Sequence, residues 1–303
     1  MKKIFIFAFL IITILSCSNK YNEPKDKIKG TLILGGKNGY TENRLVFKML
    51  SIYLKENGYN ITEIPEINIV SGYDALKNKH IDIYCEYTGT ILSLFTNTST
   101  PDPEESYILA KKRVAQDGMV LLNMAPSNNT YKIFLKKETA EKFNIKTFSD
   151  LTRLINTNRF NPIVGAGLEC IMDHLDCLGG LQKYYGFKIP EKNIIILDPK
   201  RLYNALENST INMAVSGTAE GQRLKYNPTI LVDDKQFFSA YNIAPITRED
   251  IISKYPELPY LINKLFDKLN QDELLQISFQ IDGKNEEMIY VIRNWLKKKK
   301  LIQ

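Results

Sequence analysis

Residues 31–87 read TLILGGKNGYTENRLVFKMLSIYLKENGYNITEIPEINIVSGYDALKNKHIDIYCEY, in which short apolar runs alternate with helical patterns. Three apolar runs predict strands: TLILGG (31–36), EINIV (66–70) and IDIYCEY (81–87). Residues 42–57 predict a helix whose apolar stripe consists of Val46, Leu50, Tyr53 and Leu54. Gly58 stands where a C-terminal cap is expected, and residues 73–79 predict a second, short helix. This alternation is typical of an α/β domain.

A second set of strands and helices follows the segment PSNNTY (126–131), whose proline and two asparagines favour a crossover between lobes. The strands expected in this set are YKIFLKK (131–137), PIVGAG (162–167), NIIILD (193–198) and INMAVSG (211–217). After them, residues 251–301 predict helices only, and we expect this tail to complete the first lobe. The predicted division is 30–125 with 243–303 for lobe I and 126–242 for lobe II, with a ligand cleft between the lobes.

The first residues predict export. Lys2 and Lys3 precede an apolar stretch from Ile4 to Leu15, which is shorter than the roughly 18 residues that a membrane-spanning helix needs. We therefore interpret residues 1–16 as a lipoprotein signal peptide and Cys17 as the residue that is lipidated. Residues 17–29 are polar and predict a tether to a bacterial membrane, on its periplasmic or cell-surface side. An ordinary cleaved signal is the alternative.

Composition argues against nucleic acid as a partner. The formal net charge is +6, and the basic residues are spread among many acids instead of forming a basic stripe. The dense basic run 297–300 is typical of a solvated helix end that complements the helix dipole. We therefore expect no nucleic-acid interface.

Few residues suggest catalysis, and the sequence predicts no catalytic residue, no cofactor and no metal. The chain has two histidines, and it lacks a phosphate-binding glycine motif and a nucleophile elbow. The strongest contrary pattern is Cys170-x3-His174-x2-Cys177, which could hold zinc in an exported metal-dependent hydrolase. This cluster lacks an obvious fourth partner. In an exported protein, a disulfide between Cys170 and Cys177 or two free thiols are the other readings, and both stay open.

Tyrosines at expected strand ends are more informative. The chain has 17 tyrosines, and Tyr87, Tyr131 and Tyr241 stand where a lobe edge should face the cleft. A trimethylammonium group has no N–H to donate, so a protein holds it with the negative faces of aromatic rings. Taken singly, each tyrosine is more often a core or rim residue than a ligand contact. Together they indicate a site for a quaternary-ammonium solute.

The sequence resembles the osmoprotectant-binding proteins of ABC importers, of the ProX or OpuC type, which bind glycine betaine, carnitine or choline. The resemblance covers nearly all of residues 30–302. It lies in six blocks in the family's order: GGKNGYTEN (35–43), ALKNKHIDIYCEYTGT (75–90), APSNNTY (125–131), GLQKYYGF (180–187), FFSAYNIAP (237–245) and ISFQIDG (277–283). It implies a type II periplasmic-binding-protein fold, no catalysis, and an ABC permease with its ATPase as partners.

The resemblance also implies roles for individual residues. Tyr87, Tyr131 and Tyr241 fall on walls of the family's aromatic cage, and Thr90 falls on a hydroxyl that contacts the polar end of the ligand. Lys37 and Asn43 fall near positions that can hydrogen-bond that same end.

Two departures concern the choice of ligand. Gly217 replaces a cage tyrosine, and His174 stands where an arginine commonly meets a carboxylate. These departures favour choline over carboxylated ligands, or a different small solute in the same fold. Tyr40 or Tyr73 could supply the missing wall.

Overall fold

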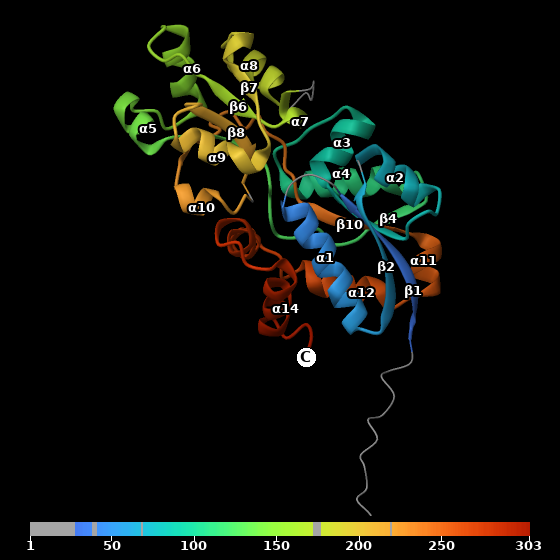
Figure 1. Cartoon of the computed structure of the whole chain (residues 1–303). Helices are drawn as coiled ribbons and strands as arrows, with labels where there is room; N and C mark the ends of the chain where they lie inside the picture. The colour runs from blue at the N-terminus through green and yellow to red at the C-terminus, as the bar shows by residue number, and fades with distance from the viewer. Residues whose placement is uncertain (1–27, 38–40, 68, 172–176, 219) are drawn as a thin grey trace, which may run out of the picture.

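Two five-stranded sheets organise the chain, as the computed structural model shows for residues 28–37, 41–67, 69–171, 177–218 and 220–303 (Figure 1). The predicted signal peptide, Cys17 and most of the predicted tether lie outside these described residues. Among the described residues, no helix combines the length and the apolar character needed to cross a membrane.

The first sheet takes four strands from the beginning of the chain and one from far along it. These strands are β1 (Gly30–Lys37), β2 (Tyr59–Ile67), β3 (Ile83–Tyr87), β4 (Met119–Leu121) and β10 (Ile243–Arg248). The order across the sheet is β2-β1-β3-β10-β4, and β1 pairs in parallel with β2 and β3. Strand β10 runs antiparallel to both of its neighbours, so the chain re-enters the first lobe through the middle of this sheet.

The second sheet repeats the same plan. Its strands are β5 (Tyr131–Leu135), β6 (Val164–Ala166), β7 (Ile194–Ile196), β8 (Met213–Gly217) and β9 (Thr229–Ile230), in the order β7-β6-β8-β5-β9. Strands β6, β7 and β8 are parallel, and β5 is antiparallel to β8. The strand that enters from the other lobe therefore takes the same place in both sheets. The lobe boundaries at residues 126 and 242 stay a prediction.

Helices cover both faces of the first sheet, which buries the sheet between two apolar cores. One core contains residues of α1 (Thr41–Glu56), α11 (Glu249–Lys254), α12 (Leu258–Phe266), α13 (Gln271–Ser278) and α14 (Met288–Lys298). The other contains residues of α2 (Ile69–Lys77), α3 (Thr88–Thr96) and α4 (Pro103–Ala115). The π-helical turn η2 (Phe279–Gly283) joins α13 to the segment before α14. The tail helices thus pack with the first lobe.

The second sheet is covered in the same manner. Its helices are α5 (Lys137–Phe143), α6 (Phe148–Asn156), α7 (Leu168–Ile171), α8 (Leu178–Tyr185), the 3-10 turn η1 (Glu191–Asn193), α9 (Pro199–Glu207) and α10 (Arg223–Tyr226). One core lies under α6 and α8 and the other under α9. Helix α6 begins at a capping box in which Thr147 and Asp150 satisfy each other's backbone N–H groups.

The strand predicted at residues 66–70 is wrong. Strand β2 begins earlier, at Tyr59, and the helix α2 begins at Ile69. The apolar run EINIV suggested a buried strand. The segment that pairs with β1 instead begins with an alternating pattern, in which Tyr59 and Ile61 are buried and Asn60 and Thr62 are exposed. Helix α3 was not predicted, because it follows β3 without an intervening turn.

Ile262 of α12 provides a test of how the tail is packed. It is fully buried in the core that α12 shares with α1 and β1, so Ile262→Ala should lower the free energy of unfolding by about 2–5 kcal/mol. Denaturant titration would measure the change. The matched control is Ile108→Ala on α4, where 63% of the side chain is exposed and a change below about 0.5 kcal/mol is expected. Equal effects of the two substitutions would contradict the packing described.

Candidate functional site

The three predicted tyrosines come together where the chain crosses between the lobes. Tyr87 ends β3, Tyr131 begins β5, and Tyr241 lies two residues before β10. The ring of Tyr241 lies 6.3 Å from the ring of Tyr87 and 5.9 Å from the ring of Tyr131, edge to face in both cases. Three segments that are far apart in sequence thus form one aromatic cluster, which we call the tyrosine cluster.

Strand pairing explains this convergence. Tyr87 pairs with Ile243 across the β3–β10 ladder, which places Tyr241 just beyond the end of β3. The backbone N–H of Asn129 donates to the carbonyl of Tyr241 at 3.0 Å, and this bond joins the two crossing segments just before β5 begins. The cluster therefore sits on the connections between the lobes.

Lys37 forms a buried ion pair beside the cluster. Its Nζ lies 2.6 Å from Oε1 of Glu86 and 5.0 Å from the centroid of the Tyr87 ring. Glu86 also accepts from the Tyr84 hydroxyl and the backbone N–H of Tyr87, each at 2.8 Å. The charge of Lys37 is thus balanced by a carboxylate that has several further partners. In the structure the ammonium of Lys37 pairs with Glu86, and its implied hydrogen bond to the polar end of the ligand stays a prediction.

Glu42 and Asn43 lie in the first turn of α1 and meet the hydroxyl of Tyr87. The hydroxyl oxygen lies 2.7 Å from Oε1 of Glu42 and 2.8 Å from Oδ1 of Asn43, and Nδ2 of Asn129 donates to it at 3.4 Å. Burial raises the pKa of Glu42 to about 7, although the Tyr87 hydroxyl, Asn129 and the charge of Lys37 oppose this shift. Sequence reasoning missed Glu42, because an acid in the first turn of a helix ordinarily complements the helix dipole.

Asn129 occupies the place next to Gly217. Tyr131 pairs with Gly217 across the β5–β8 ladder, and a Cβ added at Gly217 would lie 2.5 Å from Oδ1 of Asn129. The position where the resemblance implies a cage tyrosine therefore faces an amide. Tyr73 does not replace that wall, because it packs on Phe95 and donates to Asp117 in the core of α2 and α4. Tyr40 lies outside the described residues.

Thr90 and His174 are two further predicted residues. Thr90 is buried in the first turn of α3, next to Gly89, whose added Cβ would lie 2.6 Å from the carbonyl oxygen of Ala240. The start of α3 thus lies against the crossing segment that carries Tyr241. His174 lies outside the described residues.

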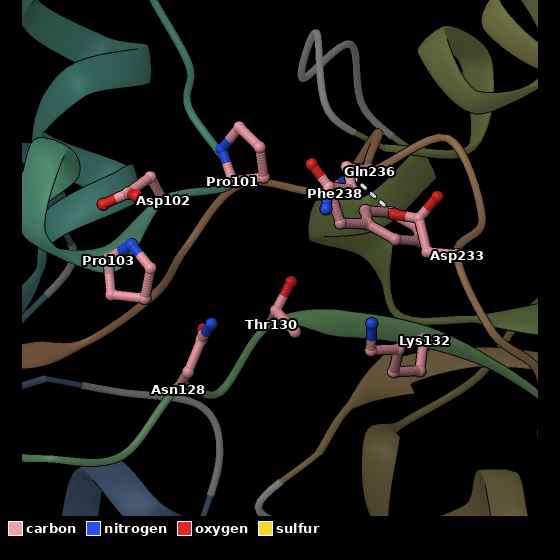
Figure 2. A pocket seen from close by; sticks show the side chains of 9 residues that line it. All are labelled: Pro101, Asp102, Pro103, Asn128, Thr130, Lys132, Asp233, Gln236 and Phe238. Atoms are coloured by element: carbon pink, nitrogen blue, oxygen red, sulfur yellow. Dashed lines mark hydrogen bonds between the residues drawn. The ribbon is translucent and has the colours of Figure 1, made fainter.

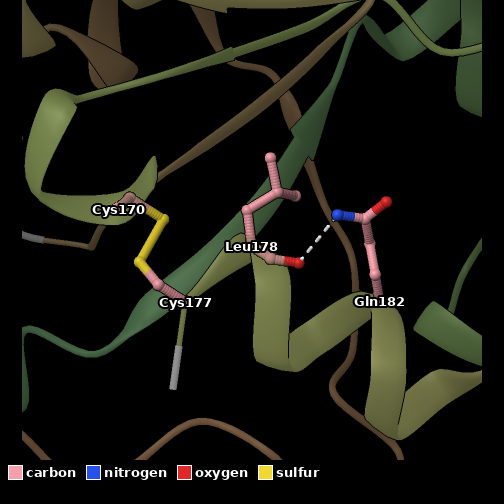
Figure 3. The surroundings of a disulfide bond; sticks show 4 residues. All are labelled: Cys170, Cys177, Leu178 and Gln182. Carbon is pink, nitrogen blue, oxygen red and sulfur yellow. Dashed lines mark hydrogen bonds between the residues drawn. A yellow bond between two sulfur atoms is a disulfide. The ribbon is translucent and has the colours of Figure 1, made fainter. Parts of the chain in front are cut away.

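Cys170 and Cys177 are joined in a disulfide (Figure 3). Their Cα atoms are 5.0 Å apart, within the usual range for a disulfide, and both side chains are buried beside α8. Sulfur atoms in a disulfide are not the thiolates that zinc binds. Within the part of the chain that the structure describes, no group of three or more potential metal ligands occurs.

A cavity of about 410 Å³ lies beside the crossing segments (Figure 2). Its lining residues are Pro101, Asp102, Pro103, Asn128, Thr130, Lys132, Asp233, Gln236 and Phe238. Thr130 and Lys132 alternate with Tyr131 along the chain, so their side chains point to the face of β5 opposite Tyr131. Burial lowers the pKa of Lys132. The three tyrosines are not among these lining residues, but the ring of Phe238 in the lining lies 6.0 Å from the ring of Tyr131, so the cavity adjoins the tyrosine cluster.

Comparison with known proteins identifies a family and several relatives of this chain. Residues 30–298 match the model of a family described as the substrate binding domain of ABC-type glycine betaine transport systems. A glycine-betaine-binding protein of Pseudomonas aeruginosa is 27% identical, over 90% of this chain and 89% of the relative. A carnitine transport binding protein of Listeria monocytogenes is also 27% identical, over 98% of this chain and 97% of the relative.

A solved structure shares the fold. The crystal structure of a glycine betaine/carnitine/choline ABC transporter protein superposes with a TM-score of 0.76 at 23% identity, covering 90% of this chain and all of that chain. The prediction of a two-lobed, type II periplasmic-binding-protein fold is confirmed. The family match spans most of the sequence, from the first strand to the last helix, so the chain belongs to the substrate-binding domains of ABC-type glycine betaine transport systems.

Proposed function

We propose that this protein captures a small quaternary-ammonium solute between its two lobes and delivers it to an ABC permease driven by its ATPase. The observation that carries the proposal is the tyrosine cluster, in which Tyr87, Tyr131 and Tyr241 from three distant segments make ring contacts. A trimethylammonium cation is attracted to aromatic faces and needs no hydrogen-bond acceptor. Relatives named for glycine betaine and carnitine support this solute class.

The position of the cluster suits capture by closure. Both crossing segments run through it, so a small rotation of one lobe about these segments changes the space between the rings. Asn43 and Thr90 add buried polar groups to the same region and Asn129 adds a half-buried one, and they would orient the uncharged or polar end of the solute. Binding is wholly non-covalent in this mechanism.

We further propose that the protein is exported and held at the membrane through a lipid on Cys17, as the residues that precede the folded body suggest. Two acyl chains anchor a protein stably, whereas one anchors it only marginally. A metal-dependent hydrolase is not proposed, because two of its three ligands would be the cysteines that form the disulfide.

Tyr241 is the first residue to test, because its ring touches both of the others. Tyr241→Ala should weaken binding of choline or glycine betaine by about 2 kcal/mol, or ~30-fold in Kd, since one face of the cage is lost. Tyr241→Phe keeps the ring and should retain most of the affinity. Isothermal titration calorimetry measures both. Tyr290→Ala on α14, where 62% of the side chain is exposed, is the control and should leave binding unchanged.

Two results would contradict the proposed function. One is a wild-type protein that binds neither solute at millimolar concentration. The other is an alanine variant at Tyr241 that binds as tightly as wild type while remaining folded by circular dichroism.

Gly217 offers a test of the packing around the cluster. In Gly217→Ala the new Cβ would collide with Oδ1 of Asn129, so we expect unfolding to become easier by about 1–3 kcal/mol. The same substitution made in an Asn129→Ala background should cost less than about 1 kcal/mol, because the colliding atom is gone. Denaturant titration of the four proteins measures this coupling. Equal costs in both backgrounds would show that Asn129 does not fill the place beside Gly217.

A further inference from the structure

The groups buried around the tyrosine cluster carry more acid than base. Lys37 and Glu86 neutralise each other in their ion pair. Glu42 then remains as a second carboxyl group, 1% exposed, whose Oε2 has no hydrogen-bond partner among the described residues. An ionised carboxylate that is buried without a cation is costly, so the site lacks one positive charge.

Glu220 brings another carboxyl group to this region from the other lobe. It follows β8, is 2% exposed, and its Oε1 also lacks a partner within the described part of the chain. The next residue, Gly221, approaches the tail of the first lobe so closely that an added Cβ would lie 2.3 Å from the backbone nitrogen of Phe279. Glu220 therefore lies where the two lobes meet, and its charge interacts with those of Glu42 and Asp282.

We propose that Glu42, assisted by Glu220, is the counter-charge of the site, so that the protein selects a solute with a net positive charge, such as choline, over a zwitterion such as glycine betaine. This proposal rests on the proposed function and adds a specificity-determining residue to it. A quaternary ammonium beside the tyrosine cluster would supply the charge that Glu42 lacks. A zwitterion brings its own carboxylate, which would add a further negative charge near two buried acids.

The contacts of Glu42 place it well for this role. Its Oε1 is held by the hydroxyl of Tyr87, whose ring is a wall of the cluster, so the free oxygen of the same carboxyl group lies close to that wall. A carboxylate attracts a nearby cation strongly when both are shielded from water. The tyrosine faces would then hold the methyl groups while Glu42 balances their charge.

Proton exchange should accompany binding. The charged and titratable groups that interact with Glu42 are Lys37 on β1, Tyr87 on β3 and Glu220 after β8, and Lys37 is itself paired with Glu86 of β3. Burial raises the pKa of Glu42 from its ordinary value of 4.5 to about 7, and burial together with the nearby charges of Asp282 and Glu42 raises the pKa of Glu220 to about 8. A bound cation favours the carboxylate form and so releases protons. If binding brings the pKa of Glu42 below 6, choline affinity rises about tenfold between pH 6 and pH 8.

The decisive experiment is calorimetric titration of the wild type and of Glu42→Gln with choline and with glycine betaine, at pH 6, 7 and 8. Titrations in buffers with different ionisation enthalpies count the protons released. In the variant, choline binding should weaken about ten- to a hundredfold at pH 8, while glycine betaine binding changes by less than about threefold. The rise of choline affinity with pH should also become flat.

Glu104→Gln is the matched control, because it removes one exposed carboxylate from α4 with the same change in total charge. It should leave every affinity unchanged. Glu42→Gln should unfold no more easily than the wild type at pH 8, since an amide replaces a buried acid whose ionisation is unfavourable. Glu220→Gln is a second variant and should weaken choline binding in the same direction.

The possible results separate the two proposals. Equal weakening of both solutes in Glu42→Gln, or tighter binding of glycine betaine than of choline by the wild type, would overturn the role of Glu42 and leave the proposed function standing. Failure of the wild type to bind either solute would overturn both.

Discussion

The pairing of β10 with β3 is the contact on which the rest of the structure depends. It returns the chain from the second lobe into the middle of the first sheet, antiparallel to its neighbours. The same pairing sets Tyr241 beside Tyr87, and its counterpart, β5 with β8, sets Tyr131 opposite Gly217. The backbone ladders that connect the lobes therefore also fix the aromatic rings, so the geometry of the cluster is coupled to the angle between the lobes.

Tyr87 links the apolar and the charged parts of the site. Its ring belongs to the cluster and lies against the ammonium of Lys37, while its hydroxyl meets Glu42 and Asn43 from α1. Burial, reinforced by Glu42, raises the pKa of this phenol well above its ordinary value, so the hydroxyl keeps its proton. The protonated hydroxyl of Tyr87 can donate to an ionised Glu42. This hydrogen bond holds the carboxylate at a fixed place relative to the Tyr87 ring.

Much of the fold and part of the site were predictable from the sequence. The periods of apolar residues predicted the alternation of strands and helices, and the strand-end context of Tyr87, Tyr131 and Tyr241 predicted that they lie together, whereas their role toward a ligand stays a prediction. The strand at 66–70 failed because a local apolar run does not reveal which residues pair with β1. Glu42 could not be found, because its partner Tyr87 is 45 positions further along the chain, and local sequence does not encode such a contact.

The place where β1 begins has a mechanical consequence. Strand β1 begins at the end of the first sheet that points away from the second lobe (Figure 1). A tether attached there would hold the first lobe alone. The second lobe would lie at the far end of the molecule and could rotate without moving the attachment point. The two lobes would then differ in motion, because the first would be fixed and the second would move during closure, even though their sheets share the same strand arrangement.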